Sequence, residues 1–436
     1  MAEMNRAESV VSETALLAGV MLPGHRYPDD PLDELHGLAT TAGARVVGSL
    51  TQRRETPDKT TYLGKGKVDE LRVLGEASDA DVIIFDNDLS PAQTRNLEKA
   101  TNLKVLDRTE LILDIFASRA QTHEARLAVE LAQLQYSLPR LKRMWTHLSR
   151  LKMGIGMRGP GEKQLEVDRR LVEKRIHDLQ TELGEVQRRK ERQVAARGDR
   201  MTVSLVGYTN AGKSTLMNAL TGASVLAQDK LFATLDTRTR RWQLPGWGPV
   251  LLSDTVGFIR DLPHHLIASF KATLEEARQA NLLLHVADAS SPAVYDQIAA
   301  VYQVVEELGI QAKDMLLVLN KVDALADRGQ LDGLLNRYPN AVAVSARKGQ
   351  GLGQLAGAVS EALSRNFLDV DIETGVGNGR LLAYLAAHGE VLSKQFSETR
   401  VVVHCRIPQK HLCHISDEQT VVRPHANGNG RMGEVA

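Results

Sequence analysis

The chain has very little cysteine and no excess of charge of either sign. Its 2 cysteines lie close together near the C-terminal end of the 436 residues, so the sequence lacks the disulfide framework of a small secreted domain. The 54 Lys and Arg residues balance the 54 Asp and Glu residues, which excludes an overall basic field that would attract nucleic acid. Any contact with nucleic acid must therefore come from a local basic patch.

Long apolar runs are also absent. No stretch is long enough to span a membrane, and the N-terminal end does not combine a charged segment with an apolar one, as secretion signals do. We therefore expect a cytoplasmic protein without a membrane span, and we take it to be a monomer. A chain of 436 residues should form two to four domains.

The most informative motif is a G-x-x-x-x-G-K-[ST] phosphate loop, which follows an apolar run at 201–206 and precedes a helical pattern at 215–220. The loop consists of Gly207, Tyr208, Thr209, Asn210, Ala211, Gly212, Lys213 and Ser214. Backbone N–H groups and the helix start would bind the α- and β-phosphates. Lys213 would reach the β- and γ-phosphates, and the Ser214 hydroxyl would ligate Mg²⁺. This context disfavours an incidental glycine-rich turn.

A second motif identifies the base of the nucleotide. The run Asn320, Lys321, Val322 and Asp323 follows an apolar stretch at 315–319. Asp323 can accept from the N1–H and the amine of guanine, whereas adenine would leave this carboxylate unpaired, so the nucleotide is GTP or GDP. Asn320 would tie this loop to the phosphate loop, and the Lys321 stem would lie over the base. A later loop of Ser345, Ala346 and Arg347 would support guanine O6 through backbone N–H groups.

Two segments between these motifs complete the site. In the run Asp254, Thr255, Val256 and Gly257, the Asp254 carboxylate would hold Mg²⁺ through water, and the Gly257 N–H would meet the γ-phosphate. Upstream lie Phe232, Ala233, Thr234, Leu235 and Asp236. Thr234 would place its hydroxyl on Mg²⁺, but Thr237 and Thr239 compete for that role.

The residue after D-T-x-G argues against catalysis by a water-orienting glutamine. Phe258 and Ile259 occupy the place where Ras-like proteins carry that glutamine. Backbone, another side chain, a bound cation or a partner must contribute instead. Asn210 either helps to hold a catalytic K⁺ or pairs with loop backbone. The candidate catalytic residues are Lys213, Thr234, Gly257 and Asn210, with slow intrinsic turnover that a partner stimulates.

The N-terminal part alternates strand and helix patterns. Strands are predicted at 15–20, 44–50 and 81–85, and helices at 30–41, 62–74 and 91–100. Gly64, Lys65, Gly66 and Lys67 stand at the start of one of these helices. They would bind the phosphate of a nucleotide or of RNA, or they form a solvated basic turn.

Two leucine seams predict an antiparallel helical hairpin between residues 124 and 197. The seam residues are Leu127, Leu131, Leu134, Leu138 and Leu141, then Val172, Ile176, Leu179, Leu183 and Val186. The join at 152–161 is rich in glycine, and no Asp or Glu occurs from Leu131 to Gly161. The nearby cations are Arg140, Lys142, Arg143, Arg150 and Lys152. A plain bundle would explain the leucines, but the basic tip favours contact with RNA phosphates.

The C-terminal part gives the weakest signals. A helix is predicted at 381–392, a strand at 400–407, and disorder after Pro424. The neighbouring metal-type residues are His404, Cys405, His411, Cys413 and His414. Adjacent strand residues point to opposite faces and no C-x-x-C spacing is present, so we expect no zinc site from this set.

These motifs resemble those of the HflX family of translation-associated GTPases over most of the chain. The resemblance rests on residues 62–67, the hairpin tip through Glu166, the phosphate loop, and the runs at 232–236 and 254–258. It implies that Thr234 is the Mg²⁺-binding threonine and that Phe258 is normal for the family. It also implies that the protein binds the 50S ribosomal subunit and its 23S rRNA and splits stalled or idle ribosomes in the GTP state. Some members of the family also bind ATP through the N-terminal region, which would give residues 64–67 a use.

The predicted fold class is α/β and multidomain. An N-terminal α/β domain (1–115) and a helical hairpin (116–198) precede a P-loop GTPase domain with a mostly parallel, doubly wound sheet (199–367) and a small α+β domain (368–436). One alternative is a GTP-regulated binding protein with a non-ribosomal target such as a membrane protease. Another is an RNA-remodelling ATPase that uses the N-terminal domain.

Overall fold

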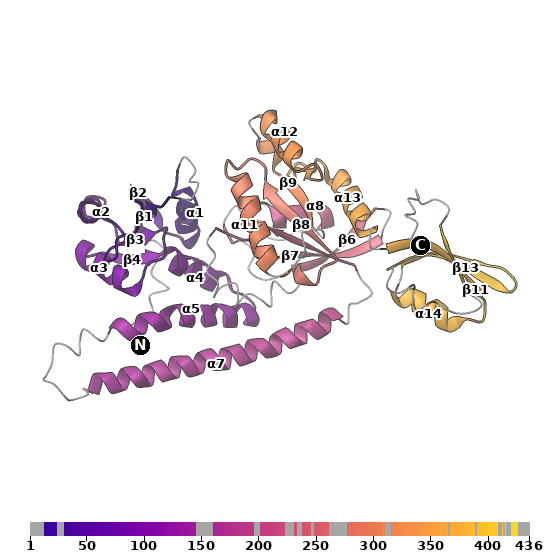
Figure 1. Ribbon diagram of the computed structural model, residues 1–436, viewed down its shortest axis with the longest axis horizontal. Helices are drawn as coiled ribbons and strands as arrows, with labels where there is room; N and C mark the ends of the chain where they lie inside the picture. Colours follow the sequence, from indigo (N-terminus) through magenta and orange to yellow (C-terminus); the bar gives the residue numbers. More distant parts are fainter. Residues whose placement is uncertain are drawn as a thin grey trace.

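The computed structural model shows an N-terminal α/β domain, a long helical hairpin, a central α/β domain and a C-terminal sheet (Figure 1). It describes residues 13–23, 30–144, 160–195, 201–222, 231–232, 238–245, 248–260, 277–307, 309, 315–325, 327–364, 367–388, 390–408, 412, 415 and 420–425. The α/β multidomain prediction is confirmed.

The N-terminal domain is built on a parallel sheet with the strand order β2-β1-β3-β4. Its elements are β1 (Thr14–Met21), α1 (Asp33–Ala42), β2 (Arg45–Arg53), α2 (Lys65–Ala77), β3 (Val82–Phe85), α3 (Pro91–Thr101), β4 (Lys104–Asp107) and α4 (Arg108–Arg119). Helices cover both faces of the sheet, so β1 and β3 consist almost entirely of buried apolar residues. The sequence did not predict β4 or α4, and the expected boundary at residue 115 falls inside α4.

The predicted antiparallel hairpin is present as α5 (His123–Met144) and α7 (Pro160–Ala195). The guanidinium of Arg175 forms two hydrogen bonds to Glu130, at 2.7 and 2.9 Å. The seam packs Leu127, Leu131 and Leu179 together. The tip at 145–159, where RNA contact was predicted, lies outside the described residues.

The central domain has a sheet with the strand order β10-β9-β8-β5-β7-β6, parallel except for the pair β6 and β7. Its elements are β5 (Thr202–Gly207), α8 (Lys213–Thr221), β6 (Arg238–Leu244), β7 (Gly248–Asp254), β8 (Leu282–Asp288), α11 (Val294–Glu307), β9 (Met315–Asn320), the 3-10 helix η3 (Val322–Ala324), α12 (Arg328–Arg337), β10 (Val342–Ala343) and α13 (Leu352–Ser364). The carboxyl ends of parallel strands meet at one edge, where such sheets bind their ligands.

The C-terminal domain is an antiparallel sheet with the strand order β12-β13-β11-β14 and one helix packed on it. Its elements are β11 (Phe367–Gly375), α14 (Gly379–His388), β12 (Glu390–Phe396), β13 (Arg400–Pro408) and β14 (Val421–Pro424). The predicted strand at 400–407 is confirmed. The predicted helix at 381–392 is too long, because α14 ends at His388 and β12 follows.

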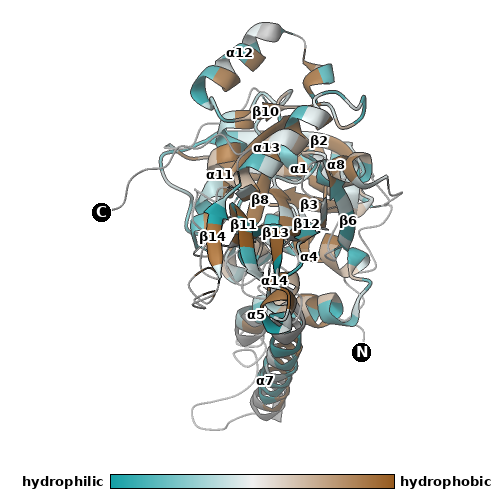
Figure 2. Ribbon diagram, turned by 90° about the vertical axis from the view of Figure 1, so that its right-hand side faces the viewer, coloured by the Kyte–Doolittle hydropathy of each residue, from teal (hydrophilic) through white to brown (hydrophobic). Residues whose placement is uncertain are grey.

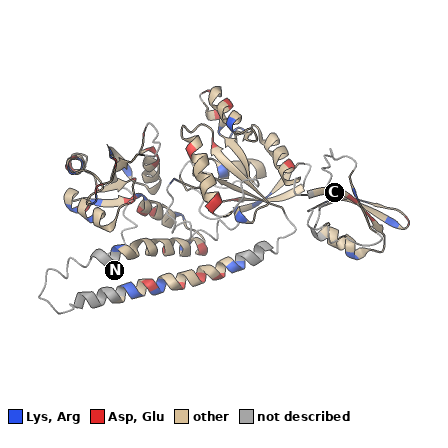
Figure 3. Ribbon diagram, viewed as in Figure 1, with Lys and Arg blue, Asp and Glu red and all other residues tan. Residues whose placement is uncertain are grey.

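Apolar residues are concentrated in the strands, whereas α7 is largely polar (Figure 2). In Figure 3, charges of both signs alternate along the described part of α7. Within the described part of the chain, no helix is long and apolar enough to cross a membrane.

One apolar core is shared by the N-terminal and central domains. It includes Leu35 of α1 and Phe116 of α4 together with Tyr208, Phe232 and Phe258 around the phosphate loop. The rings of Phe116 and Phe232 meet edge to face, with centroids 4.7 Å apart. The N-terminal domain therefore packs directly against the loops expected to bind the nucleotide.

Candidate functional site

The phosphate loop joins β5 to α8, and two of its glycines have positive φ angles that L side chains rarely adopt. Gly207 has a φ of 151° and Gly212 a φ of 89°. A Cβ on Gly207 would lie 2.1 Å from the Val286 carbonyl oxygen, and a Cβ on Gly212 would lie 2.4 Å from Asn320 Nδ2. Both glycines therefore allow the loop to approach its neighbours closely.

Lys213 begins α8 and is buried beneath the loop. Its ammonium donates hydrogen bonds to the carbonyl oxygens of Gly207 at 3.0 Å and Tyr208 at 2.8 Å. Burial lowers the pKa of Lys213 to about 8, and the nearby Asp254 carboxylate acts in the opposite direction. The loop thus holds a cation that phosphate oxygens can bind more strongly than neutral carbonyls do.

Ser214 and Asp254 supply the oxygen ligands predicted for Mg²⁺. The Ser214 hydroxyl donates to Asp254 Oδ2 at 2.6 Å, and Asp254 is fully buried at the end of β7. A hydroxyl and a carboxylate are hard oxygen donors of the kind that Mg²⁺ prefers beside nucleotide phosphates. The residues present therefore fit this ion.

Asn320 connects three loops at the end of β9. Its amide group donates to the Ala211 carbonyl at 2.9 Å, and its amide oxygen accepts from the Ala346 N–H at 3.0 Å. The structure thus brings together the phosphate loop and the two loops to which the sequence assigns base recognition.

Asp323 and Ser345 meet at the predicted guanine position. The Ser345 hydroxyl donates to Asp323 Oδ1 at 2.6 Å, and this hydrogen bond lowers the pKa of Asp323. The carboxylate is therefore anionic at neutral pH and remains an acceptor for guanine donors. Lys321 has a positive φ of 61°, and its ammonium lies 2.8 Å from Asp288 Oδ2.

The D-T-x-G segment returns to the phosphate loop after leaving β7. A Cβ on Gly257 would lie 2.8 Å from Thr209 Cα, which shows how closely the two backbones approach. The Phe258 N–H donates to the Gly207 carbonyl at 3.1 Å, and the Thr209 N–H donates to the Phe258 carbonyl at 2.6 Å. The Phe258 side chain is buried in the shared core, so it cannot orient water.

The segment predicted to carry the Mg²⁺-binding threonine is described only at Phe232. The N–H of Phe232 donates to Thr209 Oγ1 at 2.7 Å. Residues 233–237, which include Ala233, Thr234, Leu235, Asp236 and Thr237, lie outside the described residues. Thr239 lies in strand β6 and its hydroxyl is 3.0 Å from that of Ser253, so it is a strand residue and not part of the loop.

A buried polar network joins the phosphate loop to the N-terminal domain. The Tyr208 hydroxyl donates to Glu34 of α1 and accepts from the Arg260 N–H at 2.7 Å. Arg108, which is nearly inaccessible to solvent, lies 2.7 Å from both Glu34 and Asp86. Arg260, two residues after Phe258, lies 3.0 Å from the second oxygen of Asp86. The network therefore contacts both the phosphate loop and the segment after D-T-x-G.

Sequence reasoning missed this network because its members are far apart along the chain. Glu34 and Arg108 are separated by 74 positions, and Glu34 and Tyr208 by 174. A buried arginine has no local signature, and its pKa is raised by the two carboxylates that compensate its burial.

Arg140 of the hairpin has a structural role, because its guanidinium is held by a residue of the N-terminal domain. Its guanidinium lies 2.8 Å from Asp107 Oδ2 and stacks 3.4 Å from the centroid of the Tyr136 ring. The Tyr136 hydroxyl donates to the other oxygen of Asp107 at 2.7 Å. Helix α5 is thereby fixed to the N-terminal domain. RNA contact by the cations near the tip stays a prediction, and Asp107 and Tyr136 already hold the Arg140 guanidinium.

The remaining predicted phosphate motif lies at the N-terminus of α2. Gly64 is the N-cap of this helix, and its N–H donates to Gln52 Oε1 at 2.9 Å. Lys67 forms an ion pair with Glu70 at 2.7 Å. The ATP or RNA contact suggested for residues 64–67 stays a prediction.

Comparisons with known proteins match this architecture along most of the chain. Residues 29–117 match the family described as GTP-binding GTPase N-terminal, residues 119–197 match GTP-binding GTPase Middle Region, and residues 202–321 match 50S ribosome-binding GTPase.

Several proteins named GTPase HflX match this chain over most of their own length. A protein named GTPase HflX from Lacrimispora saccharolytica is 44% identical over 409 residues, covering 93% of this chain and 96% of the relative. GTPase HflX from Escherichia coli is 48% identical over 372 residues, covering 85% of this chain and 87% of the relative. A solved GTP-binding protein from Sulfolobus solfataricus, in complex with GDP, is 23% identical and covers 81% of this chain and 99% of its own. Its TM-score of 0.43 is too low to bear on function.

Proposed function

The chain belongs to the HflX family of GTPases, and from this premise we propose that it binds the large ribosomal subunit and uses GTP to separate the subunits of stalled or idle ribosomes. The GTP-hydrolysing activity follows from the family and from the P-loop domain. The ribosomal target is our proposal, and the 50S ribosome-binding description of the matching family supports it.

Nucleotide binding depends on groups that the fold already holds in place. The Lys213 ammonium would exchange its bonds to loop carbonyls for bonds to the β- and γ-phosphates. Asp323 would accept the two donors of guanine, and Asn320 would keep the base loop in register with the phosphate loop. Bound Mg²⁺ would neutralise charge on the phosphates beside Ser214 and Asp254.

Hydrolysis must rely on backbone and on added groups. The Phe258 side chain is buried, so no glutamine-like group orients the attacking water at this position. The Gly257 N–H would bind the γ-phosphate, since its backbone lies against Thr209. We therefore expect slow intrinsic turnover that rises when a partner completes the site.

Asn210 supports a role for K⁺. It has a positive φ of 60° and is exposed on the outer side of the phosphate loop. An amide oxygen there could ligate a monovalent cation next to the developing negative charge. Turnover should fall in Na⁺ for the unmodified protein, and Asn210→Ala should turn over equally slowly in both salts. Equal turnover of the unmodified protein in the two salts would reject this role.

The observation that carries the ribosomal proposal is a set of polar contacts, partly buried, that leads from the phosphate loop to the hairpin. Tyr208 contacts Glu34, and Glu34 contacts Arg108 at the start of α4. The residue before Arg108 is Asp107, which holds Arg140 of α5. A change at the γ-phosphate can therefore alter how the hairpin is held, which a splitting factor needs.

Sedimentation of intact ribosomes tests this proposal. We expect GTP and the unmodified protein to increase free subunits, and Lys213→Ala to abolish the effect. Arg158→Ala in the hairpin tip should bind GTP normally and fail to split, whereas Arg170→Ala, an exposed site on α7, should behave like the unmodified protein. If Arg158→Ala splits ribosomes as well as the control, or if no splitting occurs, a non-ribosomal target becomes the better explanation.

A further inference from the structure

The solvent-facing side of the C-terminal sheet carries a row of acids on strand β11. Asp369, Asp371 and Glu373 alternate with Val370 and Ile372, which belong to the core on the opposite face. The row therefore lies on the face that α14 does not cover.

The two outer acids of the row have permanent cations as neighbours. Glu373 lies 2.7 Å from Arg400 and 3.6 Å from Arg423. Asp369 lies 3.7 Å from Arg406 and also accepts from His404 Nε2 at 2.7 Å.

Asp371, in the middle of the row, differs from its neighbours. Arg423, which is opposite Asp371 in the register of β11 and β14, lies 3.6 Å from Glu373, whereas the Asp371 carboxylate is hydrogen-bonded to an imidazole. His425, just after β14, places Nδ1 at 2.8 and 2.9 Å from the two Asp371 oxygens. His404 is the residue directly opposite Asp371 in the register of β11 and β13. A carboxylate and two imidazoles are the donor set of a transition-metal site.

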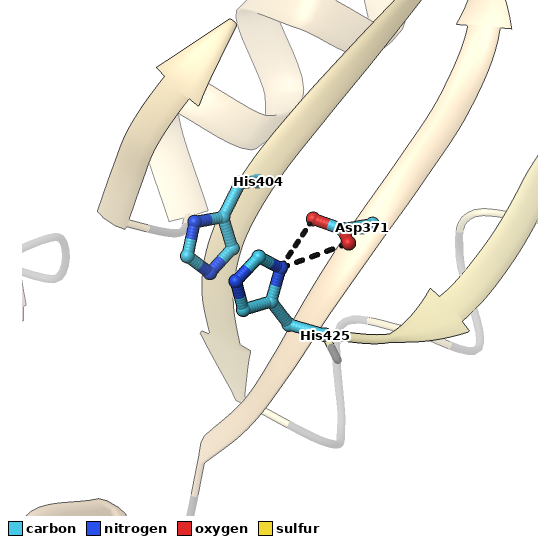
Figure 4. A group of neighbouring side chains, drawn as sticks. All are labelled: Asp371, His404 and His425. Carbon is cyan, nitrogen blue, oxygen red and sulfur yellow. Dashed lines mark hydrogen bonds and ion pairs between the residues drawn. The ribbon is translucent and has the colours of Figure 1, made fainter. Parts of the chain in front are cut away.

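The three side chains are already grouped closely enough to share one ion. One potential ligand atom from each of Asp371, His404 and His425 lies within 4.8 Å of the others. The two rings lie face to face, with centroids 3.6 Å apart and an interplanar angle of 13° (Figure 4). Ligand atoms around tetrahedral Zn²⁺ are about 3.4 Å apart, as bonds of ~2.1 Å require. All three residues are half-buried, and binding would require their side chains to rotate until this gap closes.

We propose that Asp371, His404 and His425 form a Zn²⁺ site on the exposed face of the C-terminal sheet. The ion would replace the proton between His425 Nδ1 and the Asp371 carboxylate. Asp369 would stay beside His404 and help to orient its ring, because one of its oxygens lies 2.7 Å from Nε2 of that ring. Water would complete the tetrahedral shell, and Mg²⁺ would not compete because it does not favour imidazole.

This set differs from the cysteine-containing group considered from the sequence. Cys405 points into the core and is fully buried there, while His404 lies on the other face. Burial raises the pKa of the Cys405 thiol to about 12, so it remains a neutral core residue. His411, Cys413 and His414 lie outside the described residues.

Zinc titration of the chelator-treated full-length protein tests the site directly. With a chromophoric chelator as competitor, we expect one tight equivalent of Zn²⁺ that is lost in His404→Gln and in His425→Gln. Asp369→Asn should keep the site but bind at least about tenfold more weakly, as loss of an orienting carboxylate does. His177→Gln, at an exposed position on α7, is the matched control and should bind like the unmodified protein.

Co²⁺ substitution in the unmodified protein gives a second readout that needs no variant. The proposal predicts the intense visible absorption of tetrahedral Co²⁺, removed by one equivalent of Zn²⁺. Zinc binding that is unchanged in both His404→Gln and His425→Gln would overturn the proposal. Absence of tight zinc binding and of the cobalt absorption in the unmodified protein would overturn it as well.

Discussion

Tyr208 of the phosphate loop donates its hydroxyl hydrogen bond to Glu34 of helix α1, across the boundary between two domains. The Tyr208 side chain is buried. Burial, together with the neighbouring Glu34 carboxylate, raises the pKa of the phenol, so the hydroxyl stays neutral and donates its hydrogen. A residue of the nucleotide site is thus also part of the interface with the N-terminal domain.

Tyr208→Phe should weaken that interface without affecting phosphate binding. The change removes a buried hydrogen bond to a charged group, which typically contributes about 2 kcal/mol to stability. Glu34 keeps its ion pair with Arg108, so no charge is left uncompensated. Urea unfolding should show the loss, and GTP affinity should change little. Tyr295→Phe, at an exposed position on α11, is the control, and an equal effect of both variants would contradict the account.

Lys213 should make GTP binding dependent on pH above its lowered pKa. The free protein loses the ammonium proton near pH 8, whereas bound phosphates favour the charged form. Binding above that pH must therefore take up a proton. At pH 9, affinity should be about tenfold weaker than at pH 7, since about one tenth of the lysine is charged. Calorimetry in two buffers of different ionisation enthalpy measures the proton, and binding without proton uptake at pH 9 would contradict this prediction.

His285 should make the protein less stable in mild acid. This side chain of β8 is buried and packs edge-on against Tyr302, and its Nδ1 has no hydrogen-bond partner among the described residues. Burial and the nearby Lys213 lower its pKa from 6.5 to about 3, so the folded state keeps it neutral while the unfolded state gains a proton below pH 6.5.

The expected cost of His285 is a loss of about 2 kcal/mol in the free energy of unfolding between pH 7 and pH 5. His285→Leu should remove this part of the pH dependence, and His177→Leu on the exposed face of α7 should retain it. Denaturant unfolding at the two pH values gives the comparison. An identical pH dependence in both variants would show that His285 is not the titrating group.

Asp323→Asn should change the preferred base. The amide of the introduced asparagine has one acceptor and one donor, so it cannot pair with both donors of guanine. It can pair with the N1–H donor and the O2 acceptor of xanthine. GTP affinity should fall by ~10²-fold, and xanthosine triphosphate should bind more tightly than GTP. Asp327→Asn, an N-cap of α12 outside the site, should leave base preference unchanged. Retained GTP preference in Asp323→Asn would mean that this carboxylate does not read the base.

The parts of the site that the sequence predicted are those encoded in short, continuous segments. Ser214 follows Lys213 in one loop, and Asp323 follows Asn320 in another, so residue spacing fixes where each group lies in its loop. Parallel strands then bring the separate loops to one edge of the sheet.

The unpredicted parts depend on long-range packing. The apolar run at 111–116 suits a buried helix or a buried strand equally, so α4 could not be recognised from periodicity. Glu34 and Asp86 reach the phosphate loop and the segment after D-T-x-G only because the domains dock, which brings Tyr208 and Arg260 against them. Asp371 and His425 are 54 positions apart, and they become neighbours only because β14, which ends just before His425, pairs with β11.

GTP turnover with and without purified large ribosomal subunits tests the central claim most directly. Because the buried Phe258 side chain offers no water-orienting group, we expect the large subunit to help complete the catalytic site. The account predicts slow turnover by the protein alone and activation on the order of 10²-fold or more by the large subunit. Equal turnover in the presence and absence of the subunit would contradict it.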